Sequence, residues 1–431
     1  MSHYESIMTL PEMLTLRRRF TAPREQDPVV AVRRELAHLD LASRVPPGGT
    51  VAIPVGSRGI TGIVAIIASA VTFLKESGFE PFIVPAMGSH GGGTVEGQVE
   101  VLTSLGISET SVGAQIRASM ETVVVGHTER GLPVHVDRHA NDADAIVVIN
   151  RVKPHTEFQG SVESGLLKMM LIGLGKLEGA TLYHRAAVQN GFSTLAGEAV
   201  PVVMAQSRVV GGLAILENAR EETARIEAVR IEDIFDHESR LLAEAVELMA
   251  RLPFDRADLL LIDRMGKNIS GAGLDPNVTG RGGLDNWEGL QDRRSKAAEV
   301  TRLVVRELTP ESHGNALGIG LVDLIPRRLA DQIDWEKTGL NAITALVPYK
   351  GRCPIVLPTD RDCIETALDT CGLQEPGKAQ IMHITDTLHL EIVRVSEAYR
   401  QEVEARDDLE IVDEGDFLRF DTEGNLLDPI C

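Results

Sequence analysis

The stretch ADAIVVINRVKPHTEFQG, residues 143–160, decides the fold of this chain. Residues 143–150 form an almost continuous apolar run, which is typical of a strand buried on both faces of a parallel sheet. Residues 150–160 then change to a basic sequence that contains histidine and glycine. Pro154 keeps Lys153 extended, because a proline disfavours the helical conformation of the residue before it. The stretch therefore predicts a central parallel strand that ends in a polar loop.

Two earlier segments repeat this arrangement of an apolar strand followed by a glycine-rich polar loop. Residues 51–59 read VAIPVGSRG, and residues 82–94 read FIVPAMGSHGGGT. In open parallel sheets, ligands bind outside the carboxyl ends of the strands. If the three strands are neighbours, four side chains converge on one crevice: Arg58, His90, Lys153 and His155. The GGGT sequence before a helix also favours an anion, because free N–H groups and the helix dipole attract negative charge.

Strands and helices alternate along both halves of the chain, which predicts an α/β protein with two α/β domains, mainly parallel sheets and an active-site crevice between the domains. The segment RLPFDRAD, residues 251–258, marks the boundary, and the strand–helix alternation restarts after it. We expect an N-terminal domain at 1–254 with the cofactor and catalytic loops, and a C-terminal domain at 255–395. A charged tail at 396–431 either packs back on the N-terminal domain or caps the second.

The composition excludes several classes of partner. The 431 residues carry a net charge of −20, which repels nucleic acid and anionic membranes. No uncharged apolar run is long enough to span a bilayer, and no signal peptide is recognisable. The four cysteines, Cys353, Cys363, Cys371 and Cys431, form no C-x-x-C pair, as expected in a reducing cytoplasm. We therefore expect a cytoplasmic enzyme that acts on a small molecule, and the sequence leaves a homo-oligomer open.

Taken one at a time, the motifs are compatible with several functions. Arg58 can be a surface arginine, and each histidine can be a solvated or capping side chain. The glycines of LIGLGKLEGA, residues 171–180, suggest a dinucleotide-binding turn, but helix-like sequence precedes them where a strand is required. Neither a G-x-S-x-G elbow nor an H-E-x-x-H metal motif is present.

In order along the chain, the motifs resemble those of the nickel-dependent lactate racemase family. The resemblance covers roughly residues 55–185. It consists of the Arg58 loop, GSHGGGT with His90, PH with His155, SGLLK with Lys168, and His184 sixteen residues after that lysine. A weaker likeness to a D-x-N segment of the family lies in LDPNVTGR, residues 274–281.

The resemblance implies a racemase or epimerase of a 2-hydroxy acid that uses a nickel-pincer nucleotide. In that family, the cofactor accepts hydride from Cα of the substrate, two histidines serve as acid and base, a lysine tethers the cofactor and a histidine binds nickel. Carried over to this chain, the roles are catalytic for His90 and His155; substrate-binding for Arg58, Lys153 and Asn277; cofactor-binding for Lys168, Thr94, Gly91, Gly92 and Ser57; and nickel-binding for His184.

The spacing between the tether and the nickel ligand sets a condition on the fold. A straight helix over 168–184 would separate its ends by about 24 Å, which is too far for one site. The GLGK sequence at 173–176 must therefore turn the chain back. Lys176 lies in that turn and is a rival tether.

The chain also departs from the family pattern. Val55 stands where founding members carry an aspartate, three extra residues separate His155 from Lys168, and Val278–Arg281 replace the polar and aromatic groups that follow the D-x-N segment. The substrate is therefore expected to differ from lactate. Two alternatives stay open: an NAD- or phosphosugar-linked enzyme that uses the same crevice, and a non-catalytic nucleotide-binding protein.

Overall fold

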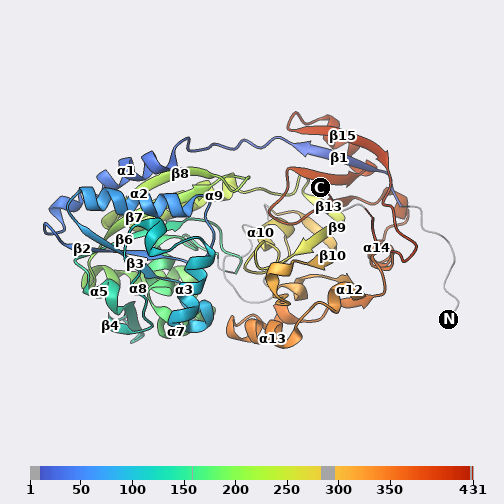
Figure 1. The fold of residues 1–431 in the computed structure, drawn as a ribbon. Helices are drawn as coiled ribbons and strands as arrows, with labels where there is room; N and C mark the ends of the chain where they lie inside the picture. Colours follow the sequence, from blue (N-terminus) through green and yellow to red (C-terminus); the bar gives the residue numbers. More distant parts are fainter. Residues whose placement is uncertain (1–9, 158, 283–296, 428–429, 431) are drawn as a thin grey trace. The chain divides into compact units, whose positions relative to one another are not determined.

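The computed structural model describes residues 10–157, 159–282, 297–427 and 430, so Cys431 lies outside the described residues. Among the described residues, 22–249 form one compact unit, and 10–21 together with 250–430 form another (Figure 1). Cys353, Cys363 and Cys371 carry free thiols. In the described ranges, none of the helices combines the length and the apolar character needed to cross a membrane.

The unit at 22–249 is built on a five-stranded sheet whose strand order is β3-β2-β6-β7-β8. All neighbouring strands are parallel except β7 and β8. The strands are β2 (Thr50–Val55), β3 (Glu80–Pro85), β6 (Ala145–Arg151), β7 (Val209–Glu217) and β8 (Thr223–Arg230), and a separate antiparallel hairpin joins β4 (Thr122–His127) to β5 (Pro133–Asp137). The central position of β6, between β2 and β7, agrees with its unbroken apolar sequence.

Helices cover both faces of this sheet, because alternate residues of each strand point to opposite sides. Val147 and Ile149 pack with α1 (Pro28–Ala37), α2 (Ile63–Glu76), α3 (Val95–Ser104) and α4 (Glu109–Val112). Ile146 and Val148 pack on the other side. That side holds α5 (Arg138–Asp142), α6 (Leu166–Lys168), the π-helix η3 (Met169–Gly173), α7 (Lys176–Asn190), α8 (Phe192–Gln206) and α9 (Ile234–Leu248). Because helices cover both faces of the sheet, the polar loops extend from the carboxyl ends of its strands.

The other unit contains an eight-stranded sheet of order β12-β11-β10-β9-β13-β14-β1-β15. The five strands from β12 to β13 are parallel, and the remaining three are added antiparallel. Its strands are β1 (Met13–Arg18), β9 (Arg256–Met265), β10 (Glu299–Leu308), β11 (Leu324–Pro326), β12 (Ile355–Leu357), β13 (Ile381–Ile384), β14 (Ile392–Ser396) and β15 (Leu409–Asp416); its helices are α10 (Pro276–Thr279), α12 (Arg327–Ala330), α13 (Trp335–Thr344), α14 (Asp360–Asp369) and α15 (Arg400–Glu404). The predicted α/β class with mainly parallel sheets is confirmed.

The two ends of the chain depart from the expected domain division. Residues 13–18 were expected in the N-terminal domain, but as β1 they pair with β14 and β15 in the eight-stranded sheet. The tail was expected on the N-terminal domain or capping the second, and it lies in the same unit as that sheet. Buried charges explain its place: the backbone N–H groups of Leu426 and Ile430 donate to Asp360 and Asp263, at 2.9 and 3.0 Å. A buried carboxylate without such donors would be costly.

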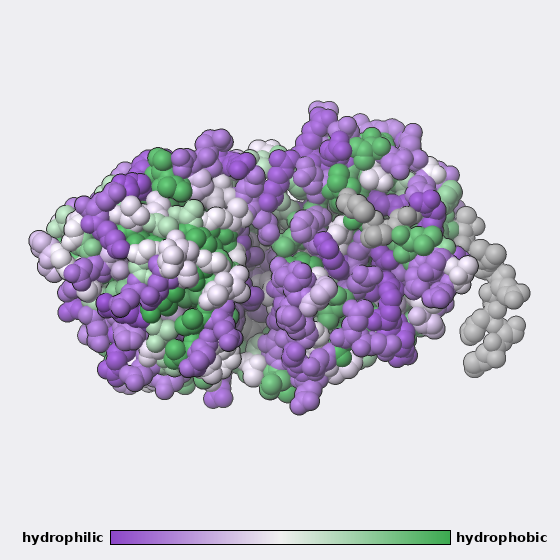
Figure 2. Space-filling view, in the orientation of Figure 1, coloured by the Kyte–Doolittle hydropathy of each residue, from purple (hydrophilic) through white to green (hydrophobic). Residues whose placement is uncertain are grey.

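The surface agrees with the charge of the sequence. Hydrophilic side chains cover most of the face drawn in Figure 2, with apolar residues scattered among them. Helix α13 exposes two large apolar side chains: Leu340 is 63% exposed and Ile343 is 65% exposed.

Candidate active site

The first two polar loops of the 22–249 unit meet through a side-chain contact. Ser57 follows β2 and His90 follows β3, and the Ser57 hydroxyl is hydrogen-bonded to Nδ1 of the His90 ring. The His90 side chain is exposed, so its ring is open to a ligand. The predicted neighbourhood of these two loops is therefore present in the fold.

Glycines and a buried glutamine shape the His90 loop. Gly91, Gly92 and Gly93 all adopt a left-handed backbone, with φ between 65° and 66°. A Cβ on Gly91 would lie 2.4 Å from the backbone of Gly97, so only glycine fits there. Gln98 is 1% exposed, and its amide donates to the carbonyl oxygens of Gly88 and His90, at 2.9 and 3.4 Å. These bonds hold the backbone that carries the His90 ring.

The loop after β6 is fixed by a carboxylate that the sequence analysis missed. Glu163 is 1% exposed and accepts backbone N–H groups from His155 at 2.8 Å and from Gly160 at 2.9 Å. Next to it, Lys153 and Ser164 form a backbone bridge, with an N–O distance of 2.8 Å. In the sequence, a glutamate between a valine and a serine in a loop looks like a solvated side chain, so no local signal pointed to this role.

The hydrogen bonds of His155 fix the position of its proton. Nδ1 of His155 accepts the backbone N–H of Glu157 at 3.0 Å. A backbone N–H can only donate, so the neutral ring carries its own proton on Nε2. In this conformation Nε2 of His155 is a hydrogen-bond donor. The ring can take a second proton, on Nδ1, only after the hydrogen bond from the Glu157 N–H is broken.

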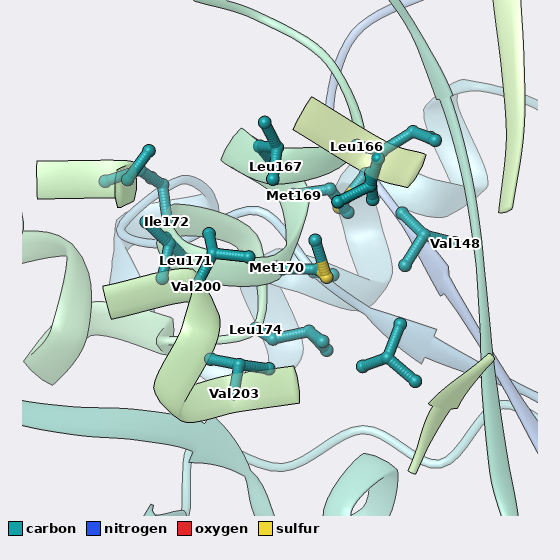
Figure 3. Close-up of a cluster of buried hydrophobic side chains, with 14 of the residues drawn as sticks. Val148, Leu166, Leu167, Met169, Met170, Leu171, Ile172, Leu174, Val200 and Val203 are labelled. Atoms are coloured by element: carbon teal, nitrogen blue, oxygen red, sulfur yellow. The ribbon is translucent and has the colours of Figure 1, made fainter. Parts of the chain in front are cut away.

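Lys168 is the exception in a buried apolar run. In the segment 166–172, LLKMMLI, all residues except Lys168 are buried. Figure 3 shows these side chains packed with Val148 of β6 and with Val200 and Val203 of α8. The segment begins as α6 and continues as the π-helix η3, a form that is rare and frequently lies at functional sites. The apolar packing thus anchors the one amine in the run.

The charges around Lys168 show which predicted residues lie together. Burial, and then the positive charges of Arg58 and Lys153, lower the pKa of Lys168 from its ordinary 10.5 to about 7, against the opposing effect of Glu163 and Glu157. Arg58 follows β2 and Lys153 follows β6, so the loops after these two strands lie near the segment that carries Lys168. An amine with this pKa is substantially neutral, and therefore nucleophilic, near pH 7.

The chain turns back between Lys168 and His184, as the spacing required. Gly175 and Gly179 leave no room for a Cβ, which would lie 2.4 Å from the Leu171 carbonyl oxygen and 2.9 Å from the Tyr183 ring, respectively. These close approaches let α7 pack on the π-helix. As a result, the charge of Lys168 acts on the His184 ring.

Lys176, the rival tether, is held in a buried ion pair. It is fully buried, and its Nζ lies 3.0 Å from Oδ2 of the equally buried Asp137. The same amine donates to the Pro85 carbonyl and, at 3.4 Å, to Gln98. Lys176 therefore joins the start of α7 to the glutamine that holds the His90 loop, and the geometry favours Lys168 as the reactive amine.

His184 has the properties of a metal ligand. Its Nδ1 lies 2.7 Å from the carbonyl oxygen of Ala180. A carbonyl can only accept, so Nδ1 carries the proton and the lone pair is on Nε2. Burial, and then the charge of Lys168, lower the pKa of His184, although the Ala180 carbonyl raises it. The ring is therefore kept neutral, with one nitrogen oriented by a backbone carbonyl, as metal-binding histidines usually are.

The arginines at the site are balanced by a glutamate of β7. Burial, and then the neighbouring positive charge of Arg151, lower the pKa of Arg58, although part of its side chain keeps access to solvent. Arg151 forms an ion pair with Glu217, which also accepts the backbone N–H of Thr61 at 3.2 Å. With Arg151 neutralised, Arg58, Lys153 and Lys168 form a local basic region suited to an anionic ligand.

Two predicted residues have other contacts. The Thr94 hydroxyl caps α3, accepting the Gly97 N–H at 3.1 Å, so cofactor binding by Thr94 would compete with this cap. Asn277 lies in the other unit, where its amide donates to Asp275 at 3.0 Å. Roles for both in binding stay predictions.

The donors around the site limit how a metal could be held. In the described ranges, no group of three or more His, Cys, Asp or Glu side chains is placed to bind a metal ion. His184 alone supplies one oriented nitrogen. To a metal carried by an organic cofactor, this region could offer the His184 nitrogen as one ligand.

Comparison with known proteins identifies this region. Residues 34–195 match the family model described as the lactate racemase N-terminal domain. This part of the chain is similar to lactate racemase N-terminal domains. The matched range includes Arg58, His90, His155, Lys168 and His184.

Among solved structures, the lactate racemase apoprotein from Thermoanaerobacterium thermosaccharolyticum aligns with a TM-score of 0.48 and 12% sequence identity, over 86% of this chain and 94% of that chain. A search of curated proteins finds no significant match.

Two lysine variants should separate the reactive from the structural amine. In the folded protein Lys168 loses its proton near pH 7, while in the unfolded chain it does so near 10.5. The free energy of unfolding should therefore rise with pH above 7, and Lys168→Met should remove that part of the rise. Lys176→Met should instead destabilise by about 3–5 kcal/mol, because it leaves Asp137 buried without its partner. Urea unfolding at pH 7 and 9 measures both; equal effects of the two variants would contradict the assignment.

Proposed function

We propose that the protein is a racemase or epimerase of a 2-hydroxy acid that works by hydride transfer with a nickel-pincer nucleotide. One observation carries the proposal: a neutral His184, whose Nδ1 is bonded to a backbone carbonyl so that the lone pair is on Nε2, lies near the low-pKa amine Lys168. The nickel ligand and the tether of such a cofactor need these two properties. When bound, the cofactor supplies the hydride acceptor.

The basic residues would bind and orient the substrate. Arg58 can hold a carboxylate through two parallel hydrogen bonds, which fixes the position of Cα. Lys153 adds a second positive charge from the neighbouring loop. The Cα–H of a 2-hydroxy acid is only weakly acidic, so the hydrogen would leave as hydride and not as a proton. Hydride transfer requires that Cα be held in a fixed orientation, which binding of the carboxylate provides.

The two histidines would handle the hydroxyl proton. Hydride can leave Cα only if a base takes the proton from the hydroxyl oxygen. His90, exposed and in contact with Ser57, is the proton acceptor for one enantiomer. His155 would serve the other; its neutral ring would first have to release the Glu157 N–H and move its own proton to Nδ1, so that Nε2 could accept the hydroxyl proton. Return of hydride to the opposite face of the planar 2-keto acid would complete the inversion.

The substrate is proposed to differ from lactate. β2 ends at Val55, where founding members of the family carry an aspartate, and Val278–Arg281 replace their polar and aromatic groups. In this chain Arg281 is occupied by an ion pair with Asp323 at 2.7 Å. A 2-hydroxy acid whose side group differs from the methyl group of lactate is the expected substrate class.

A label at Cα tests the reaction. Protein produced in a host that makes the cofactor should racemise a 2-hydroxy acid deuterated at Cα, with the deuterium retained at Cα in the product, because the hydride does not exchange with water. Mass spectrometry of substrate and product measures the retention. Rapid loss of the label to solvent would show deprotonation at carbon, and the proposal would fail. A dependence on added NAD instead would favour a dehydrogenase.

A further inference from the structure

A carboxylate outside the predicted site supports the segment that carries Lys168. Glu238 lies on α9, far from that segment in sequence, and is 1% exposed. Its Oε2 accepts the backbone N–H of Leu167 at 3.0 Å. The N–H of Leu166 acts on the same carboxyl group. Glu238 therefore meets the start of α6, one and two residues before Lys168.

The sequence of α6 explains why an acceptor from another helix is needed. The first N–H groups of a helix have no partner within it, and a Ser, Thr, Asp or Asn side chain usually accepts one. Here the residue before α6 is Gly165, which has no side chain to do so. A side chain at that position would also be excluded, since a Cβ on Gly165 would lie 2.5 Å from Cδ of Glu238. Glycine and glutamate together form one cap.

The cost of this arrangement argues that it has a purpose beyond packing. Oε1 of Glu238 is buried and has no hydrogen-bond partner in the described part of the chain. Burial raises the pKa of Glu238 to about 7, although the N–H groups of Leu167 and Leu166 oppose the rise. The neighbours of Glu238 on the helix, Leu241 and Leu242, are ordinary core residues. An apolar side chain would pack there at lower cost, but it could not hold the two N–H groups.

We propose that Glu238 is a positioning residue that fixes the start of the α6 and π-helix segment and thereby sets the direction of the Lys168 amine. The catalytic meaning of this position rests on the proposed function, in which Lys168 tethers the cofactor. The effect of Glu238 on the α6 segment can be tested in protein without cofactor. The positioning role of Glu238 and the proposed function can therefore fail separately.

The test compares three variants of the full chain by pulse labelling with acetic anhydride. Glu238→Met removes both acceptor oxygens at similar volume, Glu238→Gln keeps one, and Leu242→Ala is the control that weakens the same helix in the core. The ratio of Lys168 to Lys153 labelling should rise about fivefold in Glu238→Met, as for loss of one fixing hydrogen bond. It should fall back towards the native ratio in Glu238→Gln and stay native in Leu242→Ala.

Hydrogen exchange of the Leu166 and Leu167 amides gives the second readout. Both amides should exchange faster in Glu238→Gln than in the native protein, while amides within α9 keep their rates. This measurement decides the case if Glu238→Met does not fold. An unchanged labelling ratio in a folded Glu238→Met, an equal change in Leu242→Ala, or native exchange at Leu166 and Leu167 in Glu238→Gln would each overturn the proposal.

Discussion

Replacing His184 with alanine should leave the protein folded and unable to retain nickel. The ring is only partly buried on α7, so its loss creates a modest cavity. Yet it is the one oriented nitrogen beside Lys168, and the described part of the chain offers no cluster of protein ligands to replace it. Loss of a residue that only hydrogen-bonds to a metal ligand typically lowers metal affinity by roughly 10–100-fold, so removal of the ligand itself should lower it more.

The measurement is nickel content per chain after purification from a host that makes the cofactor. His127→Ala is the matched control, because His127 is an exposed histidine of the same unit, at the end of β4. The control should keep its nickel. Intact-chain mass adds a second test: an adduct on the native chain should be absent from Lys168→Ala. Native nickel content in His184→Ala would show that the metal, if bound, is held elsewhere.

The core of the site could be predicted because parallel sheets bring strand ends together. The apolar run at β6 identified a central strand, and the loops after β2, β3 and β6 followed from simple alternation. The turn between Lys168 and His184 was also predictable, since a straight helix would have separated the two side chains. These inferences use local sequence and one topological rule.

The rest depends on contacts between distant parts of the chain. The pairing of β1 with β15 joins residues almost 400 positions apart, and nothing in either strand specifies its partner. The apolar segment Ile319–Leu321 forms a short 3-10 turn, and the neighbouring strand β11 begins only at Leu324. The π-helix has no simple sequence signature.

The buried glutamates were missed for different reasons. Glu163 accepts N–H groups of its own loop, which sequence alone does not reveal. Glu238 had a visible signal: it falls on the apolar stripe of α9, four residues after Ile234 and three before Leu241, where a charged residue is out of place. A charge on a buried helical stripe indicates a partner on the facing segment.

The local electrostatics fit an anionic substrate despite the net charge of −20. Arg58 and Lys153 lie close enough to Lys168 for their positive charges to lower its proton affinity. A carboxylate or phosphate bound in this group would relieve the repulsion among the positive charges. Binding of an anion should therefore raise the pKa of Lys168, and a neutral amine for tethering would be available only before the anionic substrate enters.

Replacing either His90 or His155 with alanine should reduce racemisation by roughly 10²–10⁴-fold, the usual contribution of a general acid or base. Each variant keeps Arg58, Lys168 and His184, so substrate and metal binding should persist. Each should also retain a one-way partial reaction with a single enantiomer, and the two preferences should be opposite, because the rings come from different strand ends. Polarimetry started from each pure enantiomer measures the rates, and His127→Ala serves again as the control.

Rescue by free imidazole distinguishes proton transfer from structural damage. Imidazole added to His90→Ala should restore part of the rate, because the His90 ring is exposed and the space it leaves is reachable. Rescue of His155→Ala should be weaker, since the Glu157 N–H that fixes the native tautomer cannot orient a free ring as well. If both variants racemised either enantiomer at the native rate, neither histidine would transfer the proton, and the acid and base would have to be sought among other residues of the site.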